Sequence, residues 1–109
     1  MNIKQERAGS VIQKLAADFI SRNIDIAGAL VTVIRVEISP GFSQANIFFS
    51  VWPEEREREV LRALKNNFGG FYEYVKKNLK IKYMPVFKFE IDSGEKARFK
   101  IESILKKDK

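Results

Sequence analysis

The chain contains no histidine and no cysteine among its 109 residues. The absence of cysteine excludes disulfides, thiol chemistry and cysteine–metal sites, and it is typical of proteins in a reducing compartment. The absence of histidine removes the commonest general base and the commonest metal ligand. The sequence also has no GxxxxGK[ST] loop, no GxGxxG motif and no acidic residues at metal-ligand spacing. We therefore predict that the protein is not an enzyme and uses no cofactor and no metal.

Long apolar runs are missing as well. No run approaches the roughly 20 residues of a membrane-spanning helix, and the N-terminal segment MNIKQERAGS lacks the apolar stretch of a secretory signal. We expect a cytoplasmic protein with no membrane partner. With 109 residues and 45% apolar content, the chain can form one domain over residues 1–109 around one continuous core. No coiled-coil seam is present, which favours a monomer.

Positive charge is in excess and is concentrated in one segment. The chain has 20 Lys and Arg against 14 Asp and Glu, a formal net charge of +6. No acidic residue lies between Tyr74 and Phe89, whereas five lysines do: Lys76, Lys77, Lys80, Lys82 and Lys88. Lysine suits contact with backbone phosphates, and nucleic acid is the commonest acidic partner of a small basic domain. The alternative is an ordinary solvated face that keeps the protein soluble.

Hydrophobic periodicity predicts a small α+β domain. We expect a three-stranded sheet with helices on one face, built from helices at 7–23, 53–68 and 71–79, strands at 31–38, 45–52 and 85–91, and a short helix from about 94 to 106. Pro53 suits the first position of its helix, and the adjacent Gly69 and Gly70 predict the break between the second and third helices.

The strands carry two further predictions. In the first strand the alternation slips between Val33 and Ile34, which indicates a bulge or a change of face. In the second strand Ala45, Ile47, Phe49 and Val51 form the core face, so Phe48 and Trp52 lie on the opposite, more open face. A covering segment of the chain explains these aromatic residues more simply than nucleobase stacking does.

The ordered pieces of the chain resemble ribosome-binding factor A, a bacterial assembly factor of the small ribosomal subunit. The matching pieces are VTVIRVEIS (31–39), the Ala45-Asn46-Ile47 strand start, LKNNFGGFYEYVKKNL (64–79) and LKIKYMPVFKFEID (79–92). The resemblance implies a type II KH-like fold, in which an AxG-type kink between helices replaces the usual GxxG loop. Here the corresponding triplet is Phe68-Gly69-Gly70.

The resemblance also implies a function without catalysis. The protein is expected to bind the immature small ribosomal subunit and its 16S rRNA, and to assist late maturation and rRNA 5′-end processing. Lys80 and Lys82 occupy positions where the family commonly has arginine, which keeps the charge but loses the bidentate fork. Glu73 stands where the family often has arginine.

The expected RNA-binding residues join the lysine segment to basic residues of the first helix and first strand. On a helix Lys76 and Lys80 would share one face, and the glycines would let RNA approach the kink closely. The full set is Arg7, Lys14, Arg35, Asn67, Gly69, Gly70, Lys76, Lys77, Lys80, Lys82 and Lys88. The competing hypothesis is a protein-interaction module that uses the open sheet face around Phe48 and Trp52.

Overall fold

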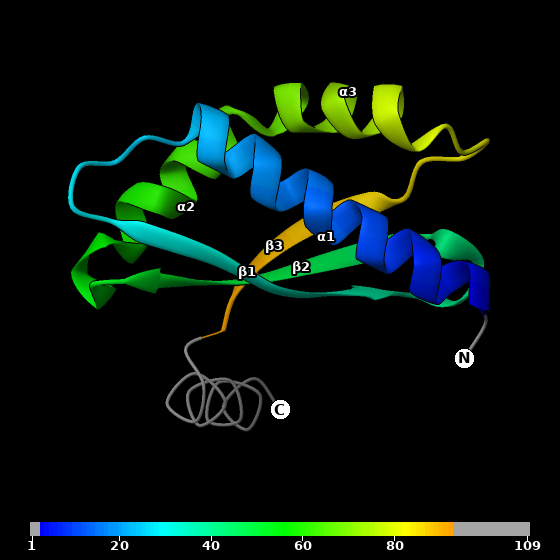
Figure 1. Cartoon of the computed structure of the whole chain (residues 1–109), viewed down its shortest axis with the longest axis horizontal. Helices are drawn as coiled ribbons and strands as arrows, with labels where there is room; N and C mark the ends of the chain where they lie inside the picture. Colours follow the sequence, from blue (N-terminus) through cyan, green and yellow to red (C-terminus); the bar gives the residue numbers. More distant parts are fainter. Residues whose placement is uncertain (1–2, 93–109) are drawn as a thin grey trace, which may run out of the picture.

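The computed structural model describes residues 3–92, in which three α-helices cover one face of a three-stranded sheet (Figure 1). The predicted α+β architecture is confirmed, and the predicted helix at 94–106 lies outside the described residues. In chain order the elements are α1 (Ile3–Asn23), β1 (Leu30–Ile38), β2 (Gln44–Trp52), α2 (Glu57–Asn66), α3 (Phe68–Leu79) and β3 (Val86–Ile91).

The middle strand of the sheet is β2. It pairs antiparallel with β1 through a tight connection that contains a 3-10 turn at Pro40–Phe42, and it pairs parallel with β3. A parallel neighbour requires a long crossover connection, and α2 and α3 form that crossover. The strand order is therefore β1-β2-β3, with the hairpin on one side of β2 and the crossover strand on the other.

A bulge in β1 keeps its apolar residues on the helix side of the sheet. The register shifts between Val33 and Arg35, so Ile34 has no partner in β2. Before the bulge Val33 packs against the core, and after it Val36 does. Because side chains alternate with period two, the extra residue is what allows both to face inward while Arg35 points outward. The predicted slip at Val33–Ile34 is confirmed as a bulge.

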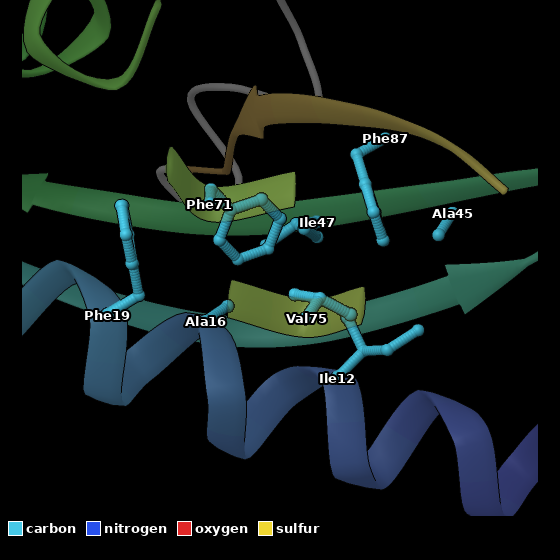
Figure 2. Packing of buried hydrophobic residues seen from close by; sticks show 8 residues of the cluster. All are labelled: Ile12, Ala16, Phe19, Ala45, Ile47, Phe71, Val75 and Phe87. Carbon is cyan, nitrogen blue, oxygen red and sulfur yellow. The ribbon is translucent and has the colours of Figure 1, made fainter. Parts of the chain in front are cut away.

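The core lies between the helices and the sheet. Figure 2 shows its larger cluster, in which side chains of α1 and α3 meet side chains of β2 and β3: Ile12, Ala16, Phe19, Ala45, Ile47, Phe71, Val75 and Phe87. Phe71 is 1% exposed, and its ring lies edge-on to Phe19, Phe87 and Phe89 at centroid distances of 5.5, 5.2 and 5.1 Å. The predicted core face of β2 is confirmed, since Ala45, Ile47 and Phe49 are fully buried.

Two predicted helix boundaries are wrong. Pro53 precedes a 3-10 turn at Glu54–Arg56, so the α-helix starts only at Glu57. The interruption between α2 and α3 falls at Asn67 (φ −105°, ψ 14°), and both glycines lie inside the first turn of α3. The reason is local hydrogen bonding: the Asn67 side-chain amide donates to the Ala63 carbonyl at 2.7 Å, which closes α2 before the glycines are reached.

Candidate nucleic-acid interface

Helices α1 and α3 lie side by side and run in opposite directions over the sheet (Figure 1). Near the C-terminal end of α1, Phe19 contacts Phe71 of α3, and the Tyr74 hydroxyl donates a hydrogen bond to the Asp18 carboxylate. This hydrogen bond is the main cause that raises the pKa of Tyr74 above its ordinary value. Asp18 also pairs with Arg22 at 3.3 Å. The Asp18 carboxylate, where the two helices meet, is therefore already partnered.

At the other end of the same helix pair the surface is hollowed. A groove of about 560 Å³ opens between the start of α1 and the segment that follows α3. It is lined by Arg7, Ala8, Val11, Phe42, Leu79, Ile81, Lys82 and Tyr83. The walls of the groove are apolar, and cations stand at its edge.

Six predicted cations surround this groove and the outer surface of α3. Arg7, Val11, Lys14 and Asp18 recur at helical spacing, so Lys14 lies on the stripe of α1 that meets Tyr74. Lys77 follows Tyr74 by three residues, so it lies on the side of α3 that faces α1. Lys76 follows Tyr72 by four residues and lies on the side nearer β3, because Tyr72 packs on Phe87. We call the exposed set Arg7, Lys14, Lys76, Lys77, Lys80 and Lys82 the α1–α3 basic surface. None of its members makes an ion pair with a side chain of residues 7–92.

The sequence predicted that Lys76 and Lys80 share one helical face. This prediction is wrong, because Lys80 is not part of the helix. Its backbone is left-handed (φ 53°, ψ 53°), and it closes α3 as the C-cap residue. The chain turns there and carries Ile81, Lys82 and Tyr83 to the groove. The lysines after α3 therefore extend the basic surface along the groove rather than along the helix.

The junction between α2 and α3 lies at the opposite end of α3 from Lys80 and the groove. Asn67 is tied to α2 by its side chain, and Gly69 and Gly70 are exposed on the first turn of α3. A Cβ atom at Gly69 would meet nothing within 4 Å, and one at Gly70 would touch the Phe19 ring at 3.5 Å. Packing against the rest of the protein therefore does not require glycine at either position.

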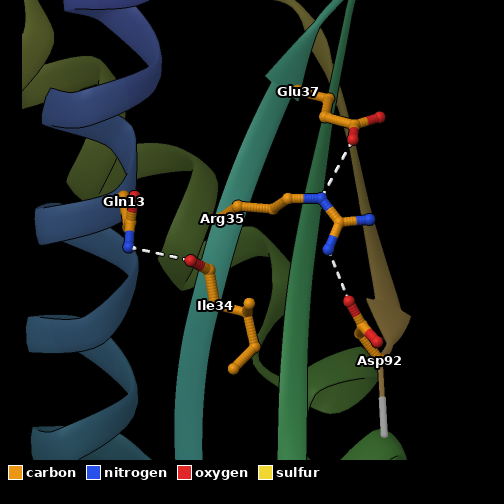
Figure 3. Close-up of polar contacts among 5 residues, drawn as sticks. All are labelled: Gln13, Ile34, Arg35, Glu37 and Asp92. Atoms are coloured by element: carbon orange, nitrogen blue, oxygen red, sulfur yellow. Dashed lines mark hydrogen bonds and ion pairs between the residues drawn. The ribbon is translucent and has the colours of Figure 1, made fainter. Parts of the chain in front are cut away.

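Arg35 and Lys88 lie on the sheet face opposite the helices, which we call the open face. Figure 3 shows Arg35 reaching across β2, where its Nε donates to Glu37 at 2.9 Å and its Nη1 donates to Asp92. The hydrogen bond to Glu37, followed by that to Asp92, raises the pKa of Arg35. On α1, Gln13 donates to the carbonyl of the bulged Ile34 at 3.2 Å, on the other side of β1 (Figure 3). Arg35 therefore links β1 to the residue that follows β3, and its charge is shared by two carboxylates of the protein.

The two aromatic residues of the open face differ in exposure. The Arg35 guanidinium carbon lies 4.0 Å from the Phe48 ring centroid and covers it in part. Trp52 is 72% exposed, and it is paired across the strands with Leu30, which is 64% exposed. Among residues 3–92 no segment covers Trp52, so the expected cover is not found in the described part of the chain.

Sequence reasoning missed the aromatic part of the groove. Phe42 and Tyr83 were not among the expected contact residues, although Tyr83 is 73% exposed and stands inside the lysine-rich segment. An exposed aromatic residue flanked by lysines was the available signal. Phe42 carried no such signal, since it reaches the groove from the turn between β1 and β2.

Comparison with known proteins decides the family. The family model of ribosome-binding factor A matches residues 4–105. The chain belongs to the ribosome-binding factor A family. Two proteins named ribosome-binding factor A illustrate the similarity. One, from Coxiella burnetii, is 27% identical over an alignment of 113 positions, which covers 99% of this chain and 95% of the relative. The other, from Rhodopirellula baltica, is 30% identical over an alignment of 101 positions, which covers 91% of this chain and 74% of the relative.

The fold of the family is shared as well. The crystal structure of ribosome-binding factor A from Thermus thermophilus superposes with a TM-score of 0.70 at 20% identity, covering 80% of this chain and 94% of that one. The predicted type II KH-like class is confirmed. Within residues 3–92 no group of acidic side chains is arranged to hold a metal ion. Nor is any helix in that range long and apolar enough to cross a membrane.

Proposed function

We propose that this protein binds the immature small ribosomal subunit through its 16S rRNA, as a cytoplasmic monomer, and assists late maturation and rRNA 5′-end processing. The observation that carries this proposal is the family match over residues 4–105. The relatives are named for binding ribosomes. The arrangement of charge supports RNA as the partner, because the α1–α3 basic surface gathers six exposed cations that make no ion pair with a side chain of residues 7–92. These cations are Arg7, Lys14, Lys76, Lys77, Lys80 and Lys82.

The α1–α3 basic surface is the part of the predicted set that we assign to rRNA. Its cations would neutralise backbone phosphates and release condensed counterions, which gives affinity without sequence readout. Two helices joined by the Asp18–Tyr74 hydrogen bond and packed on the core give these flexible side chains a rigid base. Arg35 and Lys88 point from the opposite face of the sheet, so one flat contact would not include both groups.

The test removes three charges from α3 and its C-cap. In the variant K76A/K77A/K80A we expect less protein to co-sediment with isolated small subunits. The slope of log affinity against log salt concentration should also become flatter, by about 2 for three lost phosphate contacts. The matched control is R58A/R62A/K65A, which removes three exposed charges from one stripe of α2. An unchanged affinity and slope in the α3 variant would refute this assignment, and equal losses in both variants would indicate that only net charge matters.

A second candidate function is a protein-interaction module on the open face. The observation in its favour is the exposed pair Leu30 and Trp52 at one corner of the sheet. In this case Trp52→Ala would abolish association with the subunit, while the α3 variant would bind like the unmodified protein. The two proposals thus predict opposite results for the same pair of variants.

A further inference from the structure

We propose that the groove between the start of α1 and the segment after α3 seats an unstacked base of single-stranded RNA, with Tyr83 as the stacking platform. This inference rests on the proposed function and adds to it the kind of RNA that is recognised. The volume of the groove, about 560 Å³, lies within the range of roughly 300–1,000 Å³ that is typical of pockets for small ligands. The groove is therefore large enough for one nucleotide.

The side chains of the groove match the two halves of a nucleotide. Val11, Leu79 and Ile81 offer apolar walls to a base, and Tyr83 offers an aromatic ring that is 73% exposed. Every base has a π-face, so stacking on such a ring is favourable without reading sequence. An apolar wall alone would suit a peptide equally well, and the cations decide between these occupants.

Those cations stand where phosphates on either side of a seated base would lie. The Lys82 ammonium lies 5.4 Å from the centroid of the Tyr83 ring, and Arg7 lines the groove from α1. Lys80 leads into the same segment. Among the side chains of residues 7–92, no acidic one lines the groove. Positive charge beside an exposed aromatic ring is the combination that single-strand binding surfaces use.

The backbone around the groove is held in an uncommon conformation. Within the described part of the chain, Phe42 (φ 61°) and Lys80 (φ 53°) are the residues other than glycine with positive φ. A left-handed backbone is costly for a bulky side chain and tends to occur at binding sites. Phe42 lines the groove and Lys80 directs the chain toward it. Two turns of the fold therefore adopt this conformation at the same place.

The test compares RNA forms and aromatic variants. Binding of a short single-stranded RNA, and of a duplex of the same length, is measured at several salt concentrations for the full chain. We expect Tyr83→Ala to weaken single-strand binding about tenfold with an unchanged salt slope, because stacking is lost and no charge is removed. Tyr83→Phe keeps the ring and should bind as the unmodified protein does. Duplex RNA should bind more weakly than the single strand and should not respond to Tyr83→Ala, because its bases are paired and stacked.

Val86→Ala is the control, since Val86 is 62% exposed and does not line the groove. In a single-stranded RNA that carries 2-aminopurine, the fluorescence of this base should be quenched when the unmodified protein binds and not when Tyr83→Ala binds. Thermal melting of Tyr83→Ala should match that of the unmodified protein, which excludes unfolding as the cause.

The outcomes separate this inference from the proposed function. If Tyr83→Ala binds single strands normally while K76A/K77A/K80A loses affinity and slope, the base site is refuted and the proposed function stands. If Tyr83→Ala loses the subunit but retains single-stranded RNA, the groove holds a protein segment, and the base site is again refuted. If the unmodified protein binds neither RNA nor subunits, both proposals fail.

Discussion

Tyr74 joins α3 to α1 through its ring, 5.8 Å from that of Phe19, and through its hydroxyl group. Its hydrogen bond to Asp18 is lost in Tyr74→Phe, so we expect a slightly lower midpoint of urea unfolding at neutral pH. The folded state raises the pKa of Tyr74, which means that it holds the phenolic proton more tightly than the unfolded chain does. The stabilisation is therefore complete below the ordinary pKa of 10.0 and is lost as the pH rises through the folded-state value.

The measurement is the difference in unfolding midpoint between the unmodified protein and Tyr74→Phe across pH. We expect a constant difference from neutral pH to about pH 10, and a smaller one above it. A difference that persisted unchanged in strong alkali would show that the hydroxyl contributes by packing and not through its proton. Tyr72→Phe is a suitable control, because Tyr72 packs through its ring on Phe87.

Arg35 shows how far a single residue can be interpreted from sequence. Its charge made it a candidate phosphate contact, yet Asp92, 57 residues later in the chain, accepts a hydrogen bond from it. Lys88 carried the same prediction and lies on the same open face, but no carboxylate of residues 7–92 pairs with it. The type and charge of a side chain are local properties, whereas its partners depend on which strands become neighbours.

At the scale of elements, one substitution at the junction of α2 and α3 tests whether Gly69 is helical. Gly69 lies in the first turn of α3, and a Cβ there would meet nothing within 4 Å. Gly69→Ala should therefore raise the free energy of unfolding by about 0.5 kcal/mol, since alanine loses less backbone entropy than glycine in a helix. Urea unfolding at constant slope measures this change.

RNA binding by the same variant addresses the role that the sequence suggested for the glycines. If RNA approaches this turn closely, Gly69→Ala will be more stable and will bind more weakly. If contact is confined to the α1–α3 basic surface, stability will rise and affinity will not change. A loss of stability would contradict the helical assignment of Gly69.

Elements were predicted better than their ends. Periodicity located every α-helix and strand of residues 3–92, and the broken alternation at Val33–Ile34 located the bulge, because both depend on which side chains face the core. The helix break was misplaced by two residues, since the side chain of Asn67 ends α2 before the more obvious glycines do. The groove was missed because its walls come from α1, the β1–β2 turn and the segment after α3, which no local pattern connects.

At the scale of the whole molecule, cations are divided between two faces. Arg7 and Lys14 belong to the α1–α3 basic surface, and Arg35 and Lys88 belong to the open face. Both R7A/K14A and R35A/K88A remove two charges. We expect R7A/K14A to flatten the salt dependence of single-stranded RNA binding by about 1.4 in slope, and R35A/K88A to leave the slope unchanged. The reverse result would assign RNA to the open face.

The position of β3 beside β2 also determines the order in which the fold can assemble. The β1–β2 hairpin pairs residues that are close in the chain, such as Ile38 with Ala45. On its other side Ala45 pairs with Phe87, which is much farther away along the chain. Closing the larger loop costs more entropy, and non-local pairing slows folding. During synthesis α1 and the hairpin emerge first, with one edge of β2 unpaired. The parallel strand therefore completes the sheet late, and until it does the nascent domain is exposed to strand-mediated self-association.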